Sequence, residues 1–584
     1  MSYRWKLLRV NLSTGTTQKE SLSKDWARRY FGGKGLGIKY LYEELKGGID
    51  PLSPANKFIL ATGPFTGTIV PCSGKLAIIT KSPATGTILD CSVGGRFASQ
   101  LKFAGYDMLI IEGQAASPVY LVIEDEKVEI RDATNLWGKG IFETESRLKE
   151  KHGSEPSAVC IGTAGEKMVS FACIDSEHRQ GARGGPGAVL GSKRLKAIVC
   201  SGSNDVTVPD IGRVLEFVKK TIRQDVLTDS NLGVYIDGTP QLINMSNTAG
   251  VLPTRNFQDG VFEGAQKINA DAIRQLRPQK KACFACALGC GNYIRTKDSA
   301  TEGPEYETLA LAGSNCGIDD IEAIHKFNAE CDDMGIDTIS SGNVLGFAME
   351  MTERGIKDFG IRFGDVKTYL RMPGLIARQE GIGKELSRGV RYLAKTYGGV
   401  EFAMEVKGLE LPGYDPRGSW GMGLAYATSD RGGCHMRAWP IASEAFGNLD
   451  PFTIEGKAKL VIDGQHSNAI KFSLILCDFW GLSLQTMSEI TSCVLNREVP
   501  IAELVKAGER IWNLARLFNV REGFRAMDDS LPKRIFTDRL KSGATAGQML
   551  PRRQFDAMLR EYYEIRHWDS DGIPEPEKLR ELEI

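Results

Sequence analysis

Three cysteines close together in the sequence form the strongest chemical signal in the chain. Cys283, Cys286 and Cys290 follow one another at C-x2-C-x3-C spacing. Three thiolates at this spacing can bind one face of an iron–sulfur cluster from a single tight loop, and Gly289 and Gly291 allow the loop to bend. A 4Fe–4S cluster needs four thiolates, so one more ligand must come from elsewhere. Zinc is the rival metal, because it also binds three or four thiolates.

The residues alone leave the fourth thiolate open. Cys477 lies in the segment NAIKFSLILCDFWG and Cys493 lies in EITSCVL, and either could complete the ligand set. A free cysteine otherwise behaves as a small apolar residue that is common in protein cores. We predict core positions for six other cysteines: Cys72, Cys91, Cys160, Cys173, Cys200 and Cys331.

The composition is that of a soluble globular protein with several domains. The 584 residues exceed one ordinary core, and 42% hydrophobic with 25% charged residues is a normal balance. Lys+Arg and Asp+Glu both number 73, so the net charge is zero, which argues against a general nucleic-acid binder. No apolar run approaches the roughly 18 residues of a membrane span, and no signal peptide is visible. We expect a cytoplasmic protein, where clustered cysteines indicate a metal or cluster rather than disulfides.

The chain changes character near residue 207. Before it, short runs such as KLLRVNL, KLAIITK, MVSFACI and LKAIVCSG alternate with turn residues, which predicts strands with few long helices between them. After it, DDIEAIHKFNAECDDMG and IAELVKAGERIWNLARLFNV carry apolar residues at helical spacing, and Asp210 and Gly335 are the expected helix caps. The patterns predict an α+β fold, with a β-rich domain at 1–207 and mainly helical domains at 208–410 and 411–584. The limit near 410 is placed at the segment LPGYDPRGSWGMG.

The order of the motifs resembles the aldehyde ferredoxin oxidoreductase family of tungsten enzymes. The resemblance covers nearly the whole chain and is carried by FGGKGLGIKYLYEEL, LATGPFTGT, KSPATG, GGRFASQLKFAGYDMLIIEG, ARGGPGAVLGSKRLKAI, the cysteine loop, GPEYETLALAGSNCGIDD, CDDMGIDTIS, SDRGGCHMRAWP and NVREGF. It implies a β-rich base for two pterins, with two mainly helical domains closing over them. It also implies tungsten or molybdenum held by the pterin dithiolenes, with a 4Fe–4S cluster close by.

Members of this family use a D-x-x-G-[LI]-[DC] motif twice, once for each pterin. The first copy is complete in this chain, running from Asp332 to Asp337. Carboxylates accept hydrogen bonds from pterin amine and ring N–H groups. We therefore expect Asp332 and Asp337 to bind one of the two pterins.

The second copy of the motif departs from the family pattern. Phe472 stands in place of the aspartate and Ile475 in place of the glycine, but the final Cys477 remains. In the family this cysteine is the fourth cluster ligand, so the resemblance favours Cys477 over Cys493. We still expect two pterins, with backbone groups around Leu476 helping to bind the second.

The phosphate groups of the cofactor need cations and free N–H groups. The residues that the resemblance places beside the cofactor phosphates are Lys75, Ser92, Gly94, Gly95, Arg183 and Gly184. A family asparagine in the turn after residue 91 helps to hold a magnesium ion. Ser92 stands in this turn and offers one oxygen, so a magnesium ion is expected there.

Two residues match the acid/base pair that the family implies. Glu307 lies in GPEYET and His435 lies in RGGCH. A histidine can donate a hydrogen bond to a carbonyl oxygen, and a carboxylate can deprotonate water. Glu305 is the neighbouring alternative to Glu307, and a lone histidine without this motif would be read as a core residue.

The resemblance implies that an aldehyde and water give a carboxylic acid, with electrons leaving through the cluster to ferredoxin or a ferredoxin-like subunit. It also implies a homodimer or a larger complex. One alternative is a related tungsten subunit that reduces an aryl-CoA ring. Another is a non-catalytic electron-relay subunit, which would contain iron without tungsten or molybdenum.

We predict that Cys477→Ala removes the cluster and that Cys493→Ala keeps it, because only Cys477 aligns with a ligand position. The wild type should then contain about four irons and four sulfides per chain. Iron analysis and the EPR signal of the reduced cluster measure both variants. Loss of the signal in Cys493→Ala alone would show the assignment to be wrong.

Overall fold

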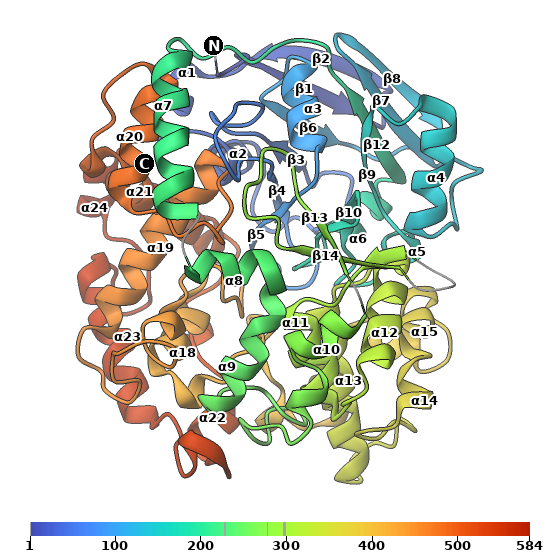
Figure 1. The fold of residues 1–584 in the computed structure, drawn as a ribbon, viewed down its shortest axis with the longest axis vertical. Helices are drawn as coiled ribbons and strands as arrows, with labels where there is room; N and C mark the ends of the chain where they lie inside the picture. Colours follow the sequence, from blue (N-terminus) through green and yellow to red (C-terminus); the bar gives the residue numbers. More distant parts are fainter. Residues whose placement is uncertain (1, 227–228, 277, 296–299) are drawn as a thin grey trace.

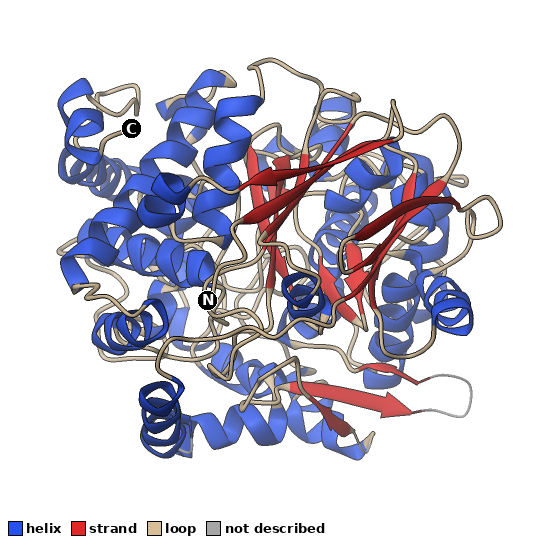
Figure 2. Ribbon diagram, turned by 90° about the horizontal axis from the view of Figure 1, so that it is seen from above, coloured by secondary structure: helices blue, strands red, loops and turns tan. Residues whose placement is uncertain are grey.

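The computed structural model describes residues 2–226, 229–276, 278–295 and 300–584. Figure 1 shows a β-rich region, coloured blue to teal, with green and yellow helices below it and orange to red helices beside it. Figure 2 shows the strands gathered in one part of the molecule, with helices around them. This arrangement confirms the α+β prediction of a β-rich N-terminal part followed by mainly helical parts. The domain limits at 207 and 410 remain predictions.

Two six-stranded sheets form the N-terminal part. The first has the order β2-β1-β6-β3-β4-β5 and the second has the order β11-β10-β9-β12-β7-β8. The strands of the first sheet are β1 (Lys6–Asn11), β2 (Thr16–Ser21), β3 (Phe58–Ala61), β4 (Leu76–Lys81), β5 (Ile88–Val93) and β6 (Met108–Glu112). Those of the second are β7 (Val119–Glu124), β8 (Lys127–Asp132), β9 (Ser157–Cys160), β10 (Ile174–Ser176), β11 (Arg179–Gly181) and β12 (Leu195–Ser201).

Successive side chains along the strands point to opposite faces of the sheet and pack into separate hydrophobic cores. In β3, Phe58 and Leu60 join a cluster shared with Ile198 of the second sheet. Ile59 and Ala61 of the same strand point to a different cluster, which contains C-terminal helix residues. Successive residues of a strand face opposite sides, so the first sheet is buried on both faces. The far face of the second sheet packs against α4 (Ile141–His152).

Helices dominate the rest of the chain. The longer ones are α7 (Ile211–Thr221), α12 (Ile321–Met334), α13 (Thr338–Glu353), α18 (Trp420–Thr428), α19 (Lys457–Leu474), α20 (Leu484–Leu495), α21 (Ile501–Arg521) and α23 (Arg552–Arg566). The predicted caps are confirmed, because Asp210 accepts from the N–H of Arg213 and Gly335 ends α12 in the left-handed conformation. No helix in the described ranges is long and apolar enough to cross a membrane.

One local prediction for the first 207 residues is wrong. The run MVSFACI is no strand before Ile174. Some of its backbone N–H groups form hydrogen bonds with distant segments instead of a neighbouring strand. The Ser170 N–H donates to the Ser387 carbonyl and the Cys173 N–H donates to the Gly335 carbonyl. Few long helices interrupt the strands, as predicted, since the longest described before residue 207 are α2 (Gly33–Glu44) and α4, with 12 residues each.

Glycines at the start of α2 allow it to approach its neighbours closely. A Cβ at Gly33 would lie 2.3 Å from the Phe472 carbonyl oxygen, and one at Gly37 would lie 2.4 Å from Ile79 of β4. Helix α2 therefore packs directly on the first sheet and on α19 and α21, which come from the other end of the chain. Glycine normally weakens a helix, and here close packing is the compensation.

A small sheet carries the cysteine loop. Strand β13 (Gln279–Lys281) pairs with β14 (Gly291–Arg295), and β14 pairs with β15 (Ala300–Glu302). Lys281 faces Gly291 in this antiparallel pair, so residues 282–290 form the loop of a hairpin. The three clustered cysteines are therefore presented together at one end of the small sheet.

A buried network of four charges joins the N-terminal part to the C-terminal part. The Lys34 ammonium group in α2 is 2.8 Å from the Asp90 carboxylate in β5 and also pairs with Asp430. Arg437 closes the network, 3.1 Å from each of the two carboxylates. All four side chains are at most 4% exposed. Two positive and two negative charges balance, which buried charges require.

We predict that Lys34→Met strongly destabilises the protein, because it leaves two buried carboxylates with one cation. Breaking a buried pair in this way costs about 3–5 kcal/mol. Lys39→Met is the matched control in the same helix, since Lys39 pairs with the more exposed Glu43 and such pairs contribute about 0.3–0.5 kcal/mol. Apparent melting midpoints measure the stability of both variants. Equal midpoints for Lys34→Met and Lys39→Met would contradict the role of the network.

Candidate active site

A cavity of about 740 Å³ brings together most of the residues selected from the sequence. Its lining includes Lys75, Ser92, Gly94, Arg183, Cys283, Cys286, Cys290, Glu307, Asp332, Asp337, His435 and Cys477. Three selected residues are not part of this lining: Gly95, Gly184 and Leu476. The lining residues come from both N-terminal sheets, the cysteine loop, α12, α13 and the segment after α19.

The cysteines of the hairpin loop and Cys477 border the same cavity. Backbone hydrogen bonds hold these segments together, since Cys477 donates to the Cys72 carbonyl and Cys72 donates to the Ala285 carbonyl. Cys493 is placed differently, in α20, where it is 5% exposed and packs within a hydrophobic cluster. Cys477 thus borders the cavity together with the three loop cysteines, and binding of a 4Fe–4S cluster by these four thiols remains a prediction.

Cys72 is a site residue that the sequence analysis missed. It was expected in the core, and it does contribute to a hydrophobic cluster. It also lines the cavity, and its sulfur lies 3.9 Å from the sulfur of Cys286. Its backbone has a φ of 59°. The available signal was its position three residues before Lys75, in a segment already assigned to the cofactor.

The two aspartates of the first pterin motif lie at the junction of two helices. Asp332, in the last turn of α12, accepts hydrogen bonds from Gln180 and Asn328 at 2.6 and 3.0 Å. Asp337 caps α13, accepting from the N–H groups of Ile339 and Ser340. Both carboxylates face the cavity, and part of their hydrogen-bonding capacity is already used by the protein.

The second, altered motif has the same helix-ending backbone as the first copy, in which Gly335 is left-handed. Ile475 ends α19 with a φ of 65°, a left-handed conformation that is unusual for a β-branched residue. The N–H of Leu476 donates to the Lys471 carbonyl, so it already has a partner. Phe472 lies under the Arg437 guanidinium, 5.5 Å from ring centroid to cation, and does not line the cavity.

The two predicted phosphate-binding cations already have partners in the protein. Lys75 lies 2.8 Å from the Asp478 carboxylate, which directly follows Cys477. Arg183 donates to the carbonyls of Glu410 and Gly433, and its Nε lies 3.5 Å from Asp337. Arg183 thereby also holds the backbone two residues before His435. Binding of phosphate by these cations, and of magnesium at Ser92, remains a prediction.

Two of the selected glycines allow close approach of other groups. A Cβ at Gly94 would lie 2.7 Å from the Cys283 sulfur, so only glycine leaves room for the cysteine loop. Gly184 has a φ of 90°, and a Cβ there would lie 2.5 Å from Leu89 of β5. The first glycine serves the cavity directly, and the second serves the packing behind it.

Glu307 and His435 face each other inside the cavity. The Nε2 atom of His435 lies 3.6 Å from Oε1 of Glu307, and the two side chains are 14% and 17% exposed. Oε2 of Glu307 accepts from the Gly413 N–H at 2.8 Å. Oε1 of Glu307 and Nδ1 of His435 are buried and have no hydrogen-bond partner among the described residues. Such atoms are costly unless a ligand or reactant satisfies them.

Burial sets the protonation states of this pair. Burial raises the pKa of Glu307 to about 7, although the Gly413 N–H and then Arg183 work against it. For His435, burial and then the cations Arg183 and Arg431 lower the pKa to about 3. A neutral imidazole thus stands beside a carboxyl group that can exchange its proton near neutral pH.

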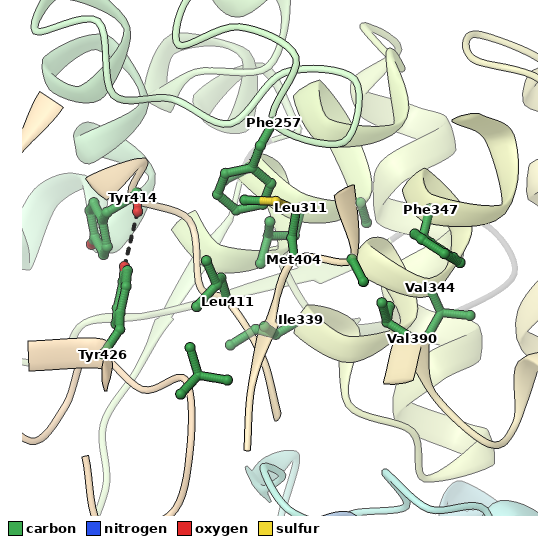
Figure 3. Packing of buried hydrophobic residues seen from close by; sticks show 14 of the residues in the cluster. Phe257, Leu311, Ile339, Val344, Phe347, Val390, Met404, Leu411, Tyr414 and Tyr426 are labelled. Atoms are coloured by element: carbon green, nitrogen blue, oxygen red, sulfur yellow. Dashed lines mark hydrogen bonds between the residues drawn. The ribbon is translucent and has the colours of Figure 1, made fainter. Parts of the chain in front are cut away.

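Aromatic rings form the wall beside His435. The ring of Tyr414 lies 5.8 Å from that of His435 and 4.9 Å from that of Tyr306, onto which it stacks. Figure 3 shows the Tyr426 hydroxyl pointing to the Tyr414 backbone, where it donates to the carbonyl at 3.0 Å. Tyr414 and Trp439 both line the cavity. The wall next to Glu307 and His435 is therefore largely apolar and firmly held.

Glu305 is engaged differently from Glu307. Its carboxylate lies 3.3 Å from the Arg179 guanidinium and accepts from the Thr239 hydroxyl at 3.0 Å. It is also twice as exposed as Glu307, at 34% against 17%. A paired carboxylate is a weaker candidate for a base than one with a free oxygen, so the geometry favours Glu307.

The fold and the site define a class of redox enzyme, and comparison with known proteins identifies it. Residues 7–202 match the N-terminal domain of aldehyde ferredoxin oxidoreductase, and residues 214–584 match its domains 2 and 3. The chain belongs to the aldehyde ferredoxin oxidoreductase family. It is an aldehyde:ferredoxin oxidoreductase-like enzyme.

Relatives of known name match along the entire chain. The tungsten-containing aldehyde ferredoxin oxidoreductase of Pyrococcus horikoshii is 43% identical, covering 99% of this chain and 98% of its own. The WOR-like subunit of an aliphatic sulfonate oxidoreductase of Pyrococcus furiosus is 30% identical, covering 100% of this chain and 97% of its own. The solved BamBC complex of benzoyl coenzyme A reductase has a TM-score of 0.85 and 23% identity, covering 100% of this chain and 97% of that one. The last similarity concerns the fold.

We predict that the Glu307 carboxyl group loses its proton as the pH rises through about 7. Infrared difference spectra of wild type minus Glu307→Gln should show a protonated-carboxyl band below this pH and a carboxylate band above it. Glu305→Gln is the control, because it keeps Glu307. The difference spectrum of Glu305→Gln minus Glu307→Gln should therefore show the same titrating band. A difference spectrum without pH dependence between about pH 5 and 9 would contradict the raised pKa.

Proposed function

We propose that this enzyme oxidises aldehydes to carboxylic acids at a tungsten or molybdenum bis-pterin centre. We also propose that electrons leave through a 4Fe–4S cluster to ferredoxin or a ferredoxin-like subunit. The observation that carries the proposal is the Glu307–His435 pair, whose unpartnered atoms lie in the same cavity as Cys283, Cys286 and Cys477. The Pyrococcus horikoshii relative is named as tungsten-containing, which supports tungsten as one of these two metals.

The cavity residues fit these groups. The four cysteines would hold the cluster, Asp332 and Asp337 would bind one pterin, and the cations Lys75 and Arg183 would bind the cofactor phosphates. When bound, the metal–pterin group supplies the two-electron acceptor for the aldehyde, and the cluster supplies the one-electron path outward. Magnesium at Ser92 and binding of the second pterin near Leu476 belong to the same proposal.

The chain's own residues manage the protons. Aldehyde plus water gives carboxylate, three protons and two electrons, so water must lose its protons as the carbon–oxygen bond forms. Ionised Glu307 accepts a proton from water at its free Oε1. Neutral His435 donates an imidazole N–H hydrogen bond to the aldehyde oxygen, which polarises the carbonyl. The aromatic rings of Tyr414 and Trp439 line the cavity beside this pair.

We predict that Glu307→Gln and His435→Asn each lower kcat for aldehyde oxidation by about 10²–10⁴, because each removes general acid/base help. Both variants should keep tungsten or molybdenum, pterin and iron. Wild-type kcat should rise with pH through about 7, since the base must be ionised, and no loss from His435 protonation should occur above about pH 4. Metal-normalised kcat values in an aldehyde assay measure these effects.

Glu305→Gln is the matched control for the acid/base assignment, and a smaller loss is expected because its carboxylate is paired with Arg179. Near-wild-type turnover per bound metal in both Glu307→Gln and His435→Asn would remove these residues from the mechanism. Lowered metal content with normal turnover per metal would assign them a structural role instead.

A further inference from the structure

Arg179 is a buried cation that no step of the proposed mechanism uses. It begins β11 and its side chain is 13% exposed. The guanidinium lies 2.5 Å from the Glu302 carboxylate and 3.3 Å from the Glu305 carboxylate. It also donates to the carbonyl of Lys281 at 3.4 Å, two residues before Cys283.

The side chain of Arg179 passes along the cysteine loop. A Cβ built at Gly94 would be 2.7 Å from the Cys283 sulfur and 3.3 Å from Cγ of Arg179, so the arginine stem runs beside this thiol. A Cβ at Gly291 would be 2.1 Å from Nη2 of Arg179, so the guanidinium lies against the residue that follows Cys290. Arg179 therefore reaches from one end of the loop to the other.

The turn that precedes Arg179 is strained and well anchored. Ser176 pairs with Arg179 across a two-residue turn, and both turn residues, Glu177 and His178, have positive φ values of 56° and 65°. Turns of this type favour Asn and Gly, and other residues cost about 1–3 kcal/mol each. The His178 ring lies 5.2 Å from that of Phe142, which helps to hold the turn. The structure thus maintains the direction of Arg179 at some cost.

A cation in this position acts on any group that the loop cysteines bind. A 4Fe–4S cluster gains one negative charge on reduction, and a nearby buried cation is screened less than a surface one. The cation then favours the reduced state, because charge and hydrogen bonds around the thiolates set the potential of such clusters. Glu302 and Glu305 oppose it with negative charge and link it to the wall that carries Glu307.

We propose that Arg179 is a positioning residue that holds the cysteine loop against the cavity wall and raises the reduction potential of the cluster. This inference rests on the cluster of the proposed function. Arg179 lies between the cysteine loop and the acidic side of the cavity, where it can match the potential of the cluster to that of the aldehyde-oxidising centre. Glu302, as its closest counter-charge, lowers the potential by the same reasoning.

EPR-monitored redox titration of the holoenzyme tests the proposal. Burial raises the pKa of Glu302 to about 7, so the titration is done at about pH 9, where Glu302 is ionised. Arg179→Gln should shift the midpoint potential of the cluster to more negative values, and Arg179→Lys should shift it less. Glu302→Gln should shift it to more positive values. Arg96→Gln is the control, because Arg96 pairs with Glu177 of the same turn but is 41% exposed. The midpoint potential of the cluster in Arg96→Gln should equal that of the wild type.

The possible outcomes separate this inference from the proposed function. A wild-type holoenzyme without a cluster signal would overturn both. A wild-type signal with unchanged midpoints in Arg179→Gln and Glu302→Gln would overturn the role of Arg179 alone. If Arg179→Gln fails to retain its cluster, the sign of the Glu302→Gln shift decides, and a negative or absent shift overturns the proposal. An equal shift in Arg96→Gln would also overturn it.

Discussion

The buried pairing of Lys34 and Arg437 with Asp90 and Asp430 is the interaction on which the rest of the structure depends. Each of these charges would cost several kcal/mol in an apolar interior without its partners, so none of the contributing segments can leave alone. The network joins α2, β5 and the segment that carries His435. His435 is thereby held at a cavity whose lining also includes residues of both N-terminal sheets, such as Ser92 and Gln180.

Close backbone approach positions the cysteine loop, as the buried charge network positions the segment around His435. Gly33 and Gly37 bring α2 onto α19 and the first sheet, and Gly94 leaves space for the Cys283 sulfur. The end of α19 then delivers Cys477 to the cysteine loop, even though Ile475 must adopt a left-handed conformation there. Glycine is therefore required at Gly94, beside the cysteine loop, and backbone strain is tolerated at Ile475, before Cys477.

Glu305 and Glu307 show how the same residue type acquires different properties two positions apart. Glu305 lies near the cavity edge and neutralises Arg179. Glu307 turns inward, where burial raises its pKa to about 7 and leaves one oxygen free. The same cavity thus holds a charged pair that can stabilise the cysteine loop and a carboxyl group that can exchange a proton.

Local patterns in the sequence determined much of this protein, and tertiary contacts decided the rest. Periodicity and side chains within a few residues predicted strands such as β1, β4 and β12, helices α12 and α21, and the caps Asp210 and Gly335. Most of the residues that the motifs selected line the cavity. MVSFACI failed as a strand because its partners, Gly335 and Ser387, are distant in sequence. Cys72, Arg179 and the free oxygen of Glu307 gained their roles only through such distant neighbours, since burial and charge pairing arise when separate segments meet.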